Sequence, residues 1–484
     1  MTGYSGRRHG RTVRPTRQLR NRDRSEEVEM SATFPVSHVP RSSLRRRGIV
    51  VLALVSALAA VPANAAPPPA EPPPPAALPD IINALVPPPP TADADPATLH
   101  RAVMPDPVGD EFFDDSPPGL DTLGEGQIVE TREVTSAAAA LLVVPVRRVT
   151  QLKFATTDAH GAPSFATATL AVPAADWSGP GPRPVVVNNV ATDGLGRACS
   201  ASYTLAHGLS PTTSPTDFVP PVTQLALSRG YAVLIPDHEG PRMAYAEPYV
   251  AGHIVLDAIR ATRAVDPGEL GDSRFGMFGY SGGAIATVAA AKLVAGYAPE
   301  LATAVAGAAA GGVPADYEML THTMNGNFAS SFFLAAVFGI ARERPEILGK
   351  MNHLAEWIAT SPLKNACISL IAPPGALSLP IDIAADITDP LHSPIAHEIL
   401  EATRMPQMRS AVPMAIINGE QEFWIPAAGA RALFEQQCRL GATASYIGVF
   451  GEHVIGMATS FEPAMTWLDD RLHGVSAPNG CPSR

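Results

Sequence analysis

Runs of apolar residues along the chain predict its strands. Residues 149–157 and 164–172 alternate apolar and polar positions on either side of a turn-forming cluster, which predicts an antiparallel hairpin. Short continuous apolar runs follow, each typical of a strand buried on both faces. They lie at 184–187, 231–235, 275–278, 414–417 and 444–449, and helical patterns separate them, notably at 254–265, 284–294 and 427–440. Such alternation predicts an α/β fold with a mostly parallel central sheet flanked by helices.

This alternation is broken from about residue 312 to residue 408. The segment is long, helical and apolar, and proline-rich breaks near Pro373 and Pro380 divide it. Its large side chains cluster at Phe328, Phe332, Phe333, Leu334 and Phe338. An insertion of this size between two strands predicts a helical cap or lid. The predicted core is then divided into residues 98–311 and residues 409–484, the second part including a C-terminal tail.

The N-terminal part of the chain has a different composition from the rest. Residues 1–47 are rich in arginine, yet the whole chain has a formal net charge of −11. The body that follows is therefore acidic, which suits neither nucleic acid nor an anionic lipid surface.

A basic segment at 41–47, an apolar run at 49–61 and small residues at 63–65 predict a signal peptide that is cleaved after Ala65. The apolar run is too short for a stable membrane span. We therefore expect the mature protein to lack residues 1–65 and to be secreted or held in the cell envelope. The pattern leaves open whether Met1 or Met30 is the start, and whether export follows the general or the twin-arginine route.

Proline and alanine dominate residues 67–90, which predicts an extended polyproline II segment within a linker at 66–97. This segment is either a spacer across an envelope layer or a disordered tail.

The chain contains four cysteines, an even number that in an exported protein predicts two disulfides. Three connectivities are possible. The alternative, four buried thiols, fits an exported protein less well. The cysteines are Cys199, Cys367, Cys438 and Cys481.

The most specific chemical motif is Gly-Tyr-Ser-Gly-Gly at residues 279–283. It lies between a predicted strand and a predicted helix, which is the context of a nucleophile elbow. The tight turn needs small residues two positions on each side of Ser281, and Gly279 and Gly283 meet this need. The turn also directs the N-terminus of the next helix at the reaction centre, where the Gly282 amide stabilises negative charge. The alternative is a glycine-rich turn with an ordinary serine.

A serine nucleophile needs a base and an acid that orients the base. In α/β-hydrolases both follow the serine, the acid first and the histidine second, on loops after late strands. His453 lies in a loop directly after the last predicted strand and is the candidate base, whereas His473 lies at the end of a terminal helix. Glu420 and Glu422 both follow the strand before, and either one could orient His453.

Two further polar loops follow earlier strands. Residues 188–196 occupy the position expected of a second oxyanion donor, or else form a structural glycine-rich turn. Asp237, His238 and Glu239 follow the next strand, but without a second group of ligands they are weak evidence for a metal. We expect a hydrogen-bonded structural loop there, and neither a metal nor a cofactor.

The chain resembles the secretory lipase family, whose members come from yeasts and actinobacteria. The resemblance covers roughly residues 110–478, and four segments in the family's order carry it. They are Pro-Asp-His-Glu-Gly at 236–240, Leu-Asp-Ala-Ile-Arg-Ala at 256–261, Gly-Tyr-Ser-Gly-Gly-Ala at 279–284 and Tyr-Ala-Pro-Glu-Leu at 297–301. The resemblance implies an α/β-hydrolase fold with a helical cap, and hydrolysis of triacylglycerols and simpler esters without a cofactor.

The resemblance also assigns roles to individual residues. It makes Ser281 the nucleophile and His453 the catalytic histidine, and the family's oxyanion aspartate falls on Asp193. The family's acid lies four residues before a proline, which selects Glu422. Since the family usually has aspartate there, the longer side chain requires a compensating shift of its loop. The matching cysteine positions imply the pairs Cys199–Cys367 and Cys438–Cys481.

These observations predict a secreted triacylglycerol lipase that acts through a Ser-His-acid triad and an acyl-enzyme. The expected partner is a lipid or ester substrate, met at a lipid–water interface, and not a nucleic acid. The alternatives are a short-chain or cell-wall carboxylesterase, a peptidase on the same fold, and a non-catalytic envelope protein that keeps the fold as a scaffold.

Overall fold

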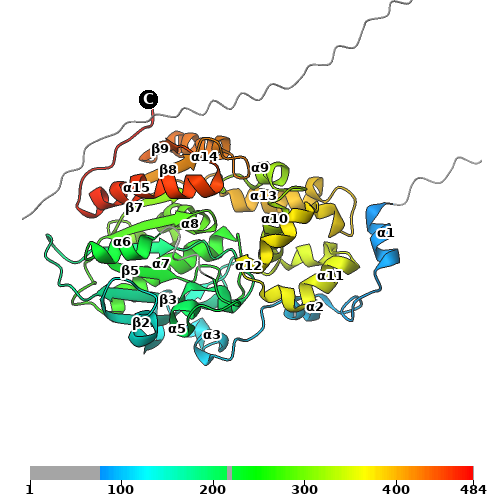
Figure 1. Ribbon diagram of the computed structural model, residues 1–484, viewed down its shortest axis with the longest axis horizontal. Coiled ribbons are helices and arrows are strands. Elements are labelled where there is room, and N and C mark those ends of the chain that lie inside the picture. The colour runs from blue at the N-terminus through cyan, green and yellow to red at the C-terminus, as the bar shows by residue number, and fades with distance from the viewer. Residues whose placement is uncertain (1–76, 215–220, 483–484) are drawn as a thin grey trace, which may run out of the picture. The chain divides into compact units, whose positions relative to one another are not determined.

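A single mixed sheet of nine strands lies at the centre of the described chain (Figure 1). The computed structural model describes residues 77–214 and 221–482, so the predicted signal peptide and the beginning of the predicted linker lie outside it. The strand order is β1-β2-β3-β5-β4-β6-β7-β8-β9. The strands are β1 Ile128–Glu133, β2 Val146–Thr157, β3 Pro163–Pro173, β4 Val185–Asn189, β5 Ala232–Pro236, β6 Phe275–Tyr280, β7 Val305–Gly311, β8 Met414–Gly419 and β9 Ala444–Val449.

The sheet is antiparallel at one end and parallel over the rest. β2 and β3 form the predicted hairpin, and β1 and β5 add to its two sides in antiparallel fashion. From β5 through β4 and β6 to β9 every neighbouring pair is parallel. The prediction of a mostly parallel α/β sheet is therefore confirmed. The carboxyl ends of these parallel strands meet at one edge, where ligands bind in sheets of this kind.

The strands β1 and β7 were not predicted. The composition of β7 explains why it was missed. Its sequence, Val-Ala-Gly-Ala-Ala-Ala-Gly, has the composition of a helix or a loop rather than of a strand. The small residues are required because large side chains cover them. A β-carbon added at Gly307 would lie 2.8 Å from the ring of Trp467, and one at Gly311 would lie 2.7 Å from the ring of Tyr280. Tertiary packing therefore selects the small residues at this strand.

Helices cover both faces of the sheet, each over its own hydrophobic core (Figure 1). α7, α8 and α14 pack against one face, and α4, α5, α6 and α15 pack against the other. Their bounds are α4 Thr135–Ala138, α5 Ala201–His207, α6 Val222–Ser228, α7 Pro248–Val265, α8 Gly282–Tyr297, α14 Ala427–Leu440 and α15 His453–Leu472.

The predicted cap occupies the connection between β7 and β8, two adjacent strands of the sheet. Its helices gather at one end of the sheet, beyond α7 and α8 (Figure 1). They are α9 Tyr317–Thr323, α10 Ser330–Ala341, α11 His353–Thr360, α12 Ile368–Ile371 and α13 Pro394–Arg404, with short 3-10 turns between them.

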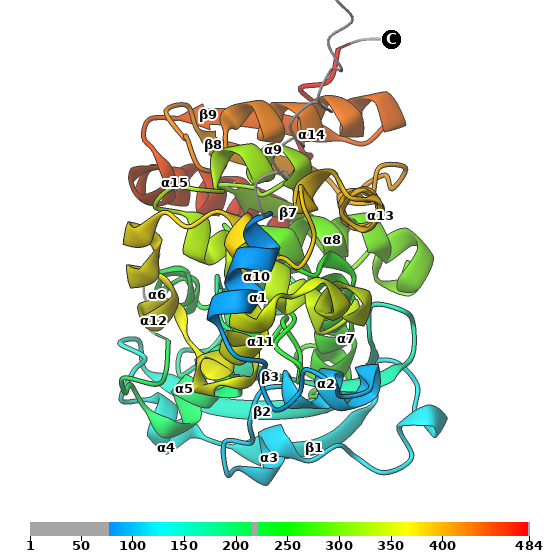
Figure 2. The ribbon, with the colours of Figure 1, turned by 90° about the vertical axis from the view of Figure 1, so that its right-hand side faces the viewer.

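The predicted linker differs from the structure. Residues 78–85, expected to be extended, form helix α1 (Leu78–Leu85), which lies across the cap in Figure 2. The Asn83 side chain accepts a hydrogen bond from the backbone of His353 in α11 (2.9 Å) and donates one to Asp386 (2.6 Å). Two short helices follow, α2 Pro96–Ala102 and α3 Glu111–Asp114. The alternation of prolines with Leu, Ile and Ala hides an amphipathic helix that the cap stabilises.

Two of the family segments meet in one ion-paired cluster between α7 and the end of α8. Arg260 donates to Asp257 (2.7 Å), to Glu300 (2.7 Å) and to the carbonyl of Tyr297 (2.9 Å). The Tyr297 hydroxyl donates to the other Asp257 oxygen (2.8 Å). Asp257 is fully buried, and this burial raises its pKa to about 6. These segments therefore join two helices behind the sheet and lie outside the chemistry.

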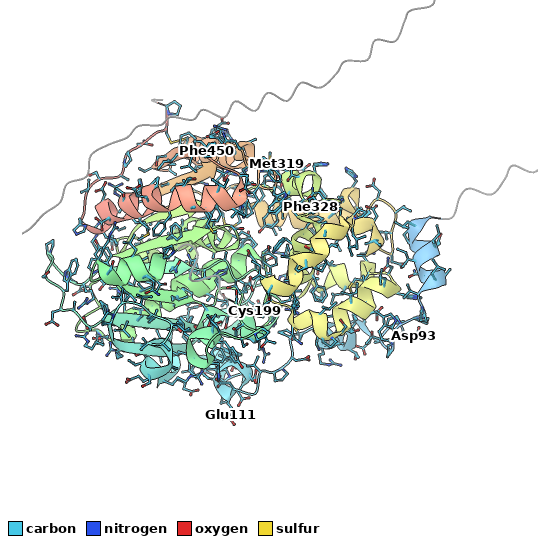
Figure 3. The ribbon with its side chains drawn as sticks, viewed as in Figure 1. Asp93, Glu111, Cys199, Met319, Phe328 and Phe450 are labelled. Atoms are coloured by element: carbon cyan, nitrogen blue, oxygen red, sulfur yellow. A yellow bond between two sulfur atoms is a disulfide. The ribbon has the colours of Figure 1, made fainter. Side chains whose placement is uncertain are left out.

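Both disulfides join distant parts of the chain. Cys199, in the 3-10 turn η2 (Arg197–Cys199), is bonded to Cys367 at the start of α12, so the pair links the core to the cap. In Figure 3 Cys199 lies where the core meets the cap helices. Cys438 in α14 is bonded to Cys481 in the C-terminal tail. These are the pairs that the family resemblance implied. Among residues 77–214 and 221–482, the helices are all too short or too polar to cross a membrane.

Candidate active site

Ser281 lies in a strained turn between β6 and α8. Its backbone angles are φ 54° and ψ −122°, a conformation that costs a non-glycine residue roughly 1–3 kcal/mol. A β-carbon at Gly279 would lie 2.0 Å from the Gly283 carbonyl oxygen, and one at Gly283 would lie 1.9 Å from that of Asn189. Both positions therefore require glycine, as the elbow motif predicts. The side chain of Ser281 stands at the carboxyl edge of the parallel strands and remains partly exposed.

A chain of two hydrogen bonds links Ser281 to His453 and Glu422. The Ser281 Oγ lies 3.0 Å from His453 Nε2, and His453 Nδ1 lies 2.7 Å from Glu422 Oε2. An ionised carboxylate only accepts hydrogen bonds, so Nδ1 carries the hydrogen and Nε2 faces the serine as an acceptor. The side chain of Glu422 is 0% exposed and that of His453 17%. The structure thus brings together the three residues that the sequence selected.

Glu422 and Glu420 have different surroundings although both follow β8. The second oxygen of Glu422 accepts the backbone amides of Trp424 (3.0 Å) and Ile425 (3.3 Å). These bonds hold the carboxylate in place against His453. Glu420 instead pairs with Arg431, which holds the pKa of the Glu420 carboxyl below its usual value, and it accepts the hydroxyl of Tyr446 (3.1 Å).

The setting of His453 differs from the prediction in one respect. It is not a loop residue but the first residue of α15, and the side chain of Glu452 caps this helix by accepting the amides of Val454 and Ile455. The Tyr280 hydroxyl donates to the His453 carbonyl (2.7 Å), and the two rings lie 5.3 Å apart. Sequence reasoning missed Tyr280, since the position between Gly279 and Ser281 accepts many residues and carries no signal of its own.

Asp193 lies in the loop after β4, beside the start of α8. Its backbone φ is 44°, it is 5% exposed, and its Oδ1 has no hydrogen-bond partner. This oxygen lies over Gly282, because a β-carbon at Gly282 would be 1.9 Å from it. The structure therefore places the predicted oxyanion residues Asp193 and Gly282 side by side.

His238 binds the backbone of this loop, and the neighbouring Asp237 binds β3 and α5. Asp237 accepts the Thr167 hydroxyl (2.5 Å) and the backbone amide of Ser202 (3.1 Å), and burial raises its pKa to about 6. His238 Nε2 lies 2.7 Å from the Val190 carbonyl and donates to it, and burial lowers the pKa of His238 to about 4. The two side chains are thus partners of the protein backbone, as expected for a structural loop.

Comparison with known proteins shows the family of the chain. The family model of secretory lipases matches residues 217–480. The chain belongs to the secretory lipase family. Among its relatives is a lipase A from Arthroderma benhamiae, 29% identical over 401 residues, which span 78% of this chain and 82% of that protein. A probable inactive lipase from Mycobacterium tuberculosis is 28% identical over 389 residues, 78% of this chain and 85% of that protein.

Solved structures show the same fold. The closed state of Candida antarctica lipase A matches with a TM-score of 0.69 and 25% identity, over 78% of this chain and 89% of that one. A rice cell wall degrading esterase from Xanthomonas oryzae matches with a TM-score of 0.52 and 14% identity, over 72% and 97% of the two chains. The second likeness concerns the fold alone. The α/β-hydrolase fold and the family that the sequence segments implied are therefore confirmed.

Proposed function

We propose that this secretory lipase family member is an exported serine hydrolase that cleaves carboxylic esters of lipids. One observation carries the proposal: the hydrogen-bonded chain from Ser281 through His453 to Glu422, set on a strained elbow. A serine hydroxyl is a weak nucleophile until a neighbouring base takes its proton. The unprotonated Nε2 of His453, 3.0 Å from the hydroxyl oxygen, is in reach to do so.

The steps follow from this geometry. Ser281 Oγ attacks the ester carbonyl while its proton passes to His453 Nε2, and Glu422 stabilises the resulting imidazolium. His453 then returns the proton to the leaving alcohol as the tetrahedral intermediate collapses to an acyl-enzyme. Water then attacks the acyl carbon while giving a proton to His453. As this second intermediate collapses, His453 passes that proton to Ser281 Oγ, the bond from Oγ to the acyl carbon breaks, and the acid is released. The disulfides and the secretory character of the family support export.

The oxyanion of the intermediate needs preorganised donors. We assign this role to the backbone amides of Gly282 and Asp193. Gly282 begins α8, a helix of 16 residues, so its amide adds the field of the helix N-terminus to its own dipole. The side chain of Asp193 lies directly over Gly282, so its loop, which follows β4, borders the elbow.

We propose lipid esters as the substrates because large apolar side chains are exposed on the cap and beside the triad residues. Phe328 of the cap region, Phe423 beside Glu422, and Phe450 just before His453 are 68%, 57% and 71% exposed. Large apolar side chains that are exposed on the cap and next to two of the triad residues favour an acyl chain over a polar substrate. The catalytic roles and the class of substrate are open to separate tests.

Labelling with a fluorophosphonate probe tests the class of protein, since only an activated serine reacts. We expect the wild type to be labelled and the Ser281→Ala variant to remain unlabelled. A folded wild type that neither reacts with the probe nor hydrolyses p-nitrophenyl esters would be a non-catalytic scaffold, like the relative named a probable inactive lipase. Rates on p-nitrophenyl esters of increasing chain length then separate a lipase from a short-chain carboxylesterase.

A further inference from the structure

Three ionisable side chains lie buried in and next to the loop after β4 (residues 190–196, the oxyanion-side loop), and the mechanism above uses the side chain of none of them. Asp193, Glu239 and Arg342 are 5%, 4% and 0% exposed. Asp193 Oδ1 and both oxygens of Glu239 have no hydrogen-bond partner. Buried polar atoms without partners are rare and require an explanation. Glu239 belongs to the Pro-Asp-His-Glu-Gly segment, whose Asp237 and His238 have backbone partners.

Arg342 brings a positive charge into this interior from the end of cap helix α10. Its guanidinium donates to five acceptors, and all five are neutral carbonyls. They belong to Val103, Leu195, Arg242, Met243 and Lys364, at 2.7 to 3.2 Å. A buried charge of this kind is costly unless an opposite charge lies near it. Glu239 supplies that charge, and its attraction opposes the effect of burial, which lowers the pKa of Arg342 to about 9.

Glu239 faces the oxyanion-side loop as well as Arg342. Its carboxyl lies against the backbone amides of Asp193 and Gly194, though in neither case with the alignment of a proper hydrogen bond. Burial, together with repulsion from Asp193, raises the pKa of Glu239 well above its usual value. Burial also raises the pKa of Asp193 to about 6, against the attraction of His453. The two carboxyl groups therefore repel each other in the interior, and Glu239 also faces the buried positive charge of Arg342.

We propose that Asp193 and Glu239 hold a single proton between them, balanced by Arg342, and that this shared proton keeps the oxyanion site free of a full negative charge. The inference rests on the proposed function. Glu239 and Arg342 are then positioning residues, since they act on the reaction through Asp193. Two acids and one base are neutral only with one proton present, and like charges at close range do not both ionise readily.

The position of Asp193 makes this proton important for the reaction. Its Oδ1 lies over Gly282, the residue whose amide is assigned to the oxyanion. A fully charged carboxylate there repels the negative charge that develops in the transition state, and the low dielectric of the interior strengthens the repulsion. Loss of the proton at high pH should therefore lower kcat more than it changes KM.

Other ionisable groups face the cluster from four directions. They are His453 of α15, Tyr245 of the loop before α7, Tyr317 of α9, which faces Tyr245, and Arg197 of η2, which faces Arg342. Burial raises the pKa of both tyrosines well above the usual value, so their hydroxyls stay neutral.

The pH dependence of kcat on a soluble ester tests the proposal. The wild type should lose activity on the alkaline side by about tenfold or more. In Glu239→Gln the one remaining negative charge sits on Asp193. The midpoint of the alkaline fall in kcat should therefore move to lower pH by about one unit or more. In Asp193→Asn the descent should disappear, whatever rate remains, and asparagine tolerates the φ of 44° at this position.

Asp237→Asn is the matched control. Asp237 lies in the same segment as Glu239, it is also buried, and its pKa is likewise raised, but its partners are Thr167 and Ser202. Its profile should keep the wild-type alkaline descent. The proposal is overturned if Glu239→Gln has the wild-type midpoint, or if Asp193→Asn keeps the descent.

A second measurement separates this proposal from the proposed function. Because the fold binds the shared proton more tightly than the unfolded chain does, the free energy of unfolding should contain a part that falls as the pH rises above about 4 and that keeps falling until the shared proton is lost at alkaline pH. This part should be present in Ser281→Ala and absent when Asp193→Asn and Glu239→Gln are added to it. If the wild type proves inactive on every ester, the proposed function fails, and this comparison still decides whether the proton is shared. The proposal is overturned if the free energy of unfolding has the same pH dependence in Ser281→Ala and in the variant that also carries Asp193→Asn and Glu239→Gln.

Discussion

At the residue scale, the candidate site consists of three side chains from three separate segments, and their roles predict different losses. Ser281→Ala and His453→Ala should each lower kcat by about a thousandfold or more, since the pair acts as one unit. Glu422→Ala should cost less, because this carboxylate orients and stabilises the imidazole without reacting. The measurement is the steady-state rate on a p-nitrophenyl ester, with circular dichroism to show that each variant is folded.

Glu420→Ala is the matched control for the acid. Glu420 lies two residues before Glu422, but its carboxylate is engaged with Arg431 and Tyr446 on the surface. Its loss should leave kcat close to that of the wild type. A larger loss in Glu420→Ala than in Glu422→Ala would show that the wrong acid has been selected.

The family usually has aspartate at the position of Glu422, and the longer glutamate leads to a second prediction. Glu422 reaches His453 and the amides of Trp424 and Ile425 at the same time. Shortening the side chain by one methylene withdraws the carboxylate by about 1.5 Å, so Glu422→Asp loses one of the two sets of bonds. We expect kcat to fall by about tenfold or more, since a displacement of 1 Å can cost about a hundredfold. A rate equal to or above that of the wild type would show that the loop adapts.

The sequence predicts a feature of this site best when the residues that form it lie close together along the chain. The local motif around Ser281 contains much of the reason for its own strained turn, since Gly279 meets Gly283 within the motif, although Gly283 also meets Asn189 of β4. The choice between Glu420 and Glu422 needed the family resemblance, because both follow the same strand and differ only in which way they point. The cluster of Asp193, Glu239 and Arg342 is assembled from three distant segments, and each member alone resembles an ordinary loop or helix residue.

At the scale of elements, the cap is fastened to the core at several points. The Cys199–Cys367 bond joins it to the oxyanion-side loop, Arg342 donates to carbonyls on both sides of the boundary, and Lys292 of α8 donates to the carbonyl of Arg404 at the end of α13 (3.2 Å). The N-terminal helix α1 adds contacts from outside. The cap thus helps to shape the loop that carries Asp193.

The two disulfides should therefore differ in their effects. Replacing both Cys199 and Cys367 by serine should lower the free energy of unfolding by roughly 2–4 kcal/mol and also lower kcat, because the loop beside Gly282 loses its tie to the cap. The Cys438→Ser/Cys481→Ser variant should lose stability but keep kcat, since that bond holds only the C-terminal tail. Denaturant unfolding and ester hydrolysis measure the two quantities. An equal kcat in both variants would contradict this role of the cap.

Elements were predictable where local pattern and packing agree. The buried strands with branched side chains and the hairpin of β2 and β3 have patterns that belong to one structure only. In β7, the alanines and glycines are there because Trp467 and Tyr280 lie over the strand. In α1, the helix depends on its contacts with the cap. In both cases the deciding contact lies far away in the sequence, so local pattern does not reveal it.

At the scale of the whole molecule, the acidic chain carries exposed apolar side chains on its cap and in the loops next to Glu422 and His453. With a net charge of −11 it has no electrostatic attraction to an anionic surface, so any adsorption must come from apolar contact with an uncharged lipid phase. Phe328, Phe423 and Phe450 are placed for such contact, and a lipid phase would shelter them from water. The substrate should therefore be an aggregated neutral lipid more than a dissolved one.

We accordingly predict hydrolysis of medium and long acyl esters, with rates that rise when the substrate forms an emulsion. The measurement is the activity on tributyrin and on a long-chain triglyceride, each below and above its solubility limit. Phe328→Ser should lower the rate on the emulsion while leaving the rate on a dissolved ester unchanged. Val143→Ser is the matched control, because Val143 is 86% exposed but lies in the loop between α4 and β2. Activity confined to acetyl and butyryl esters in free solution would make this protein a simple esterase, since an acyl chain of four carbons has no need of an apolar shelter.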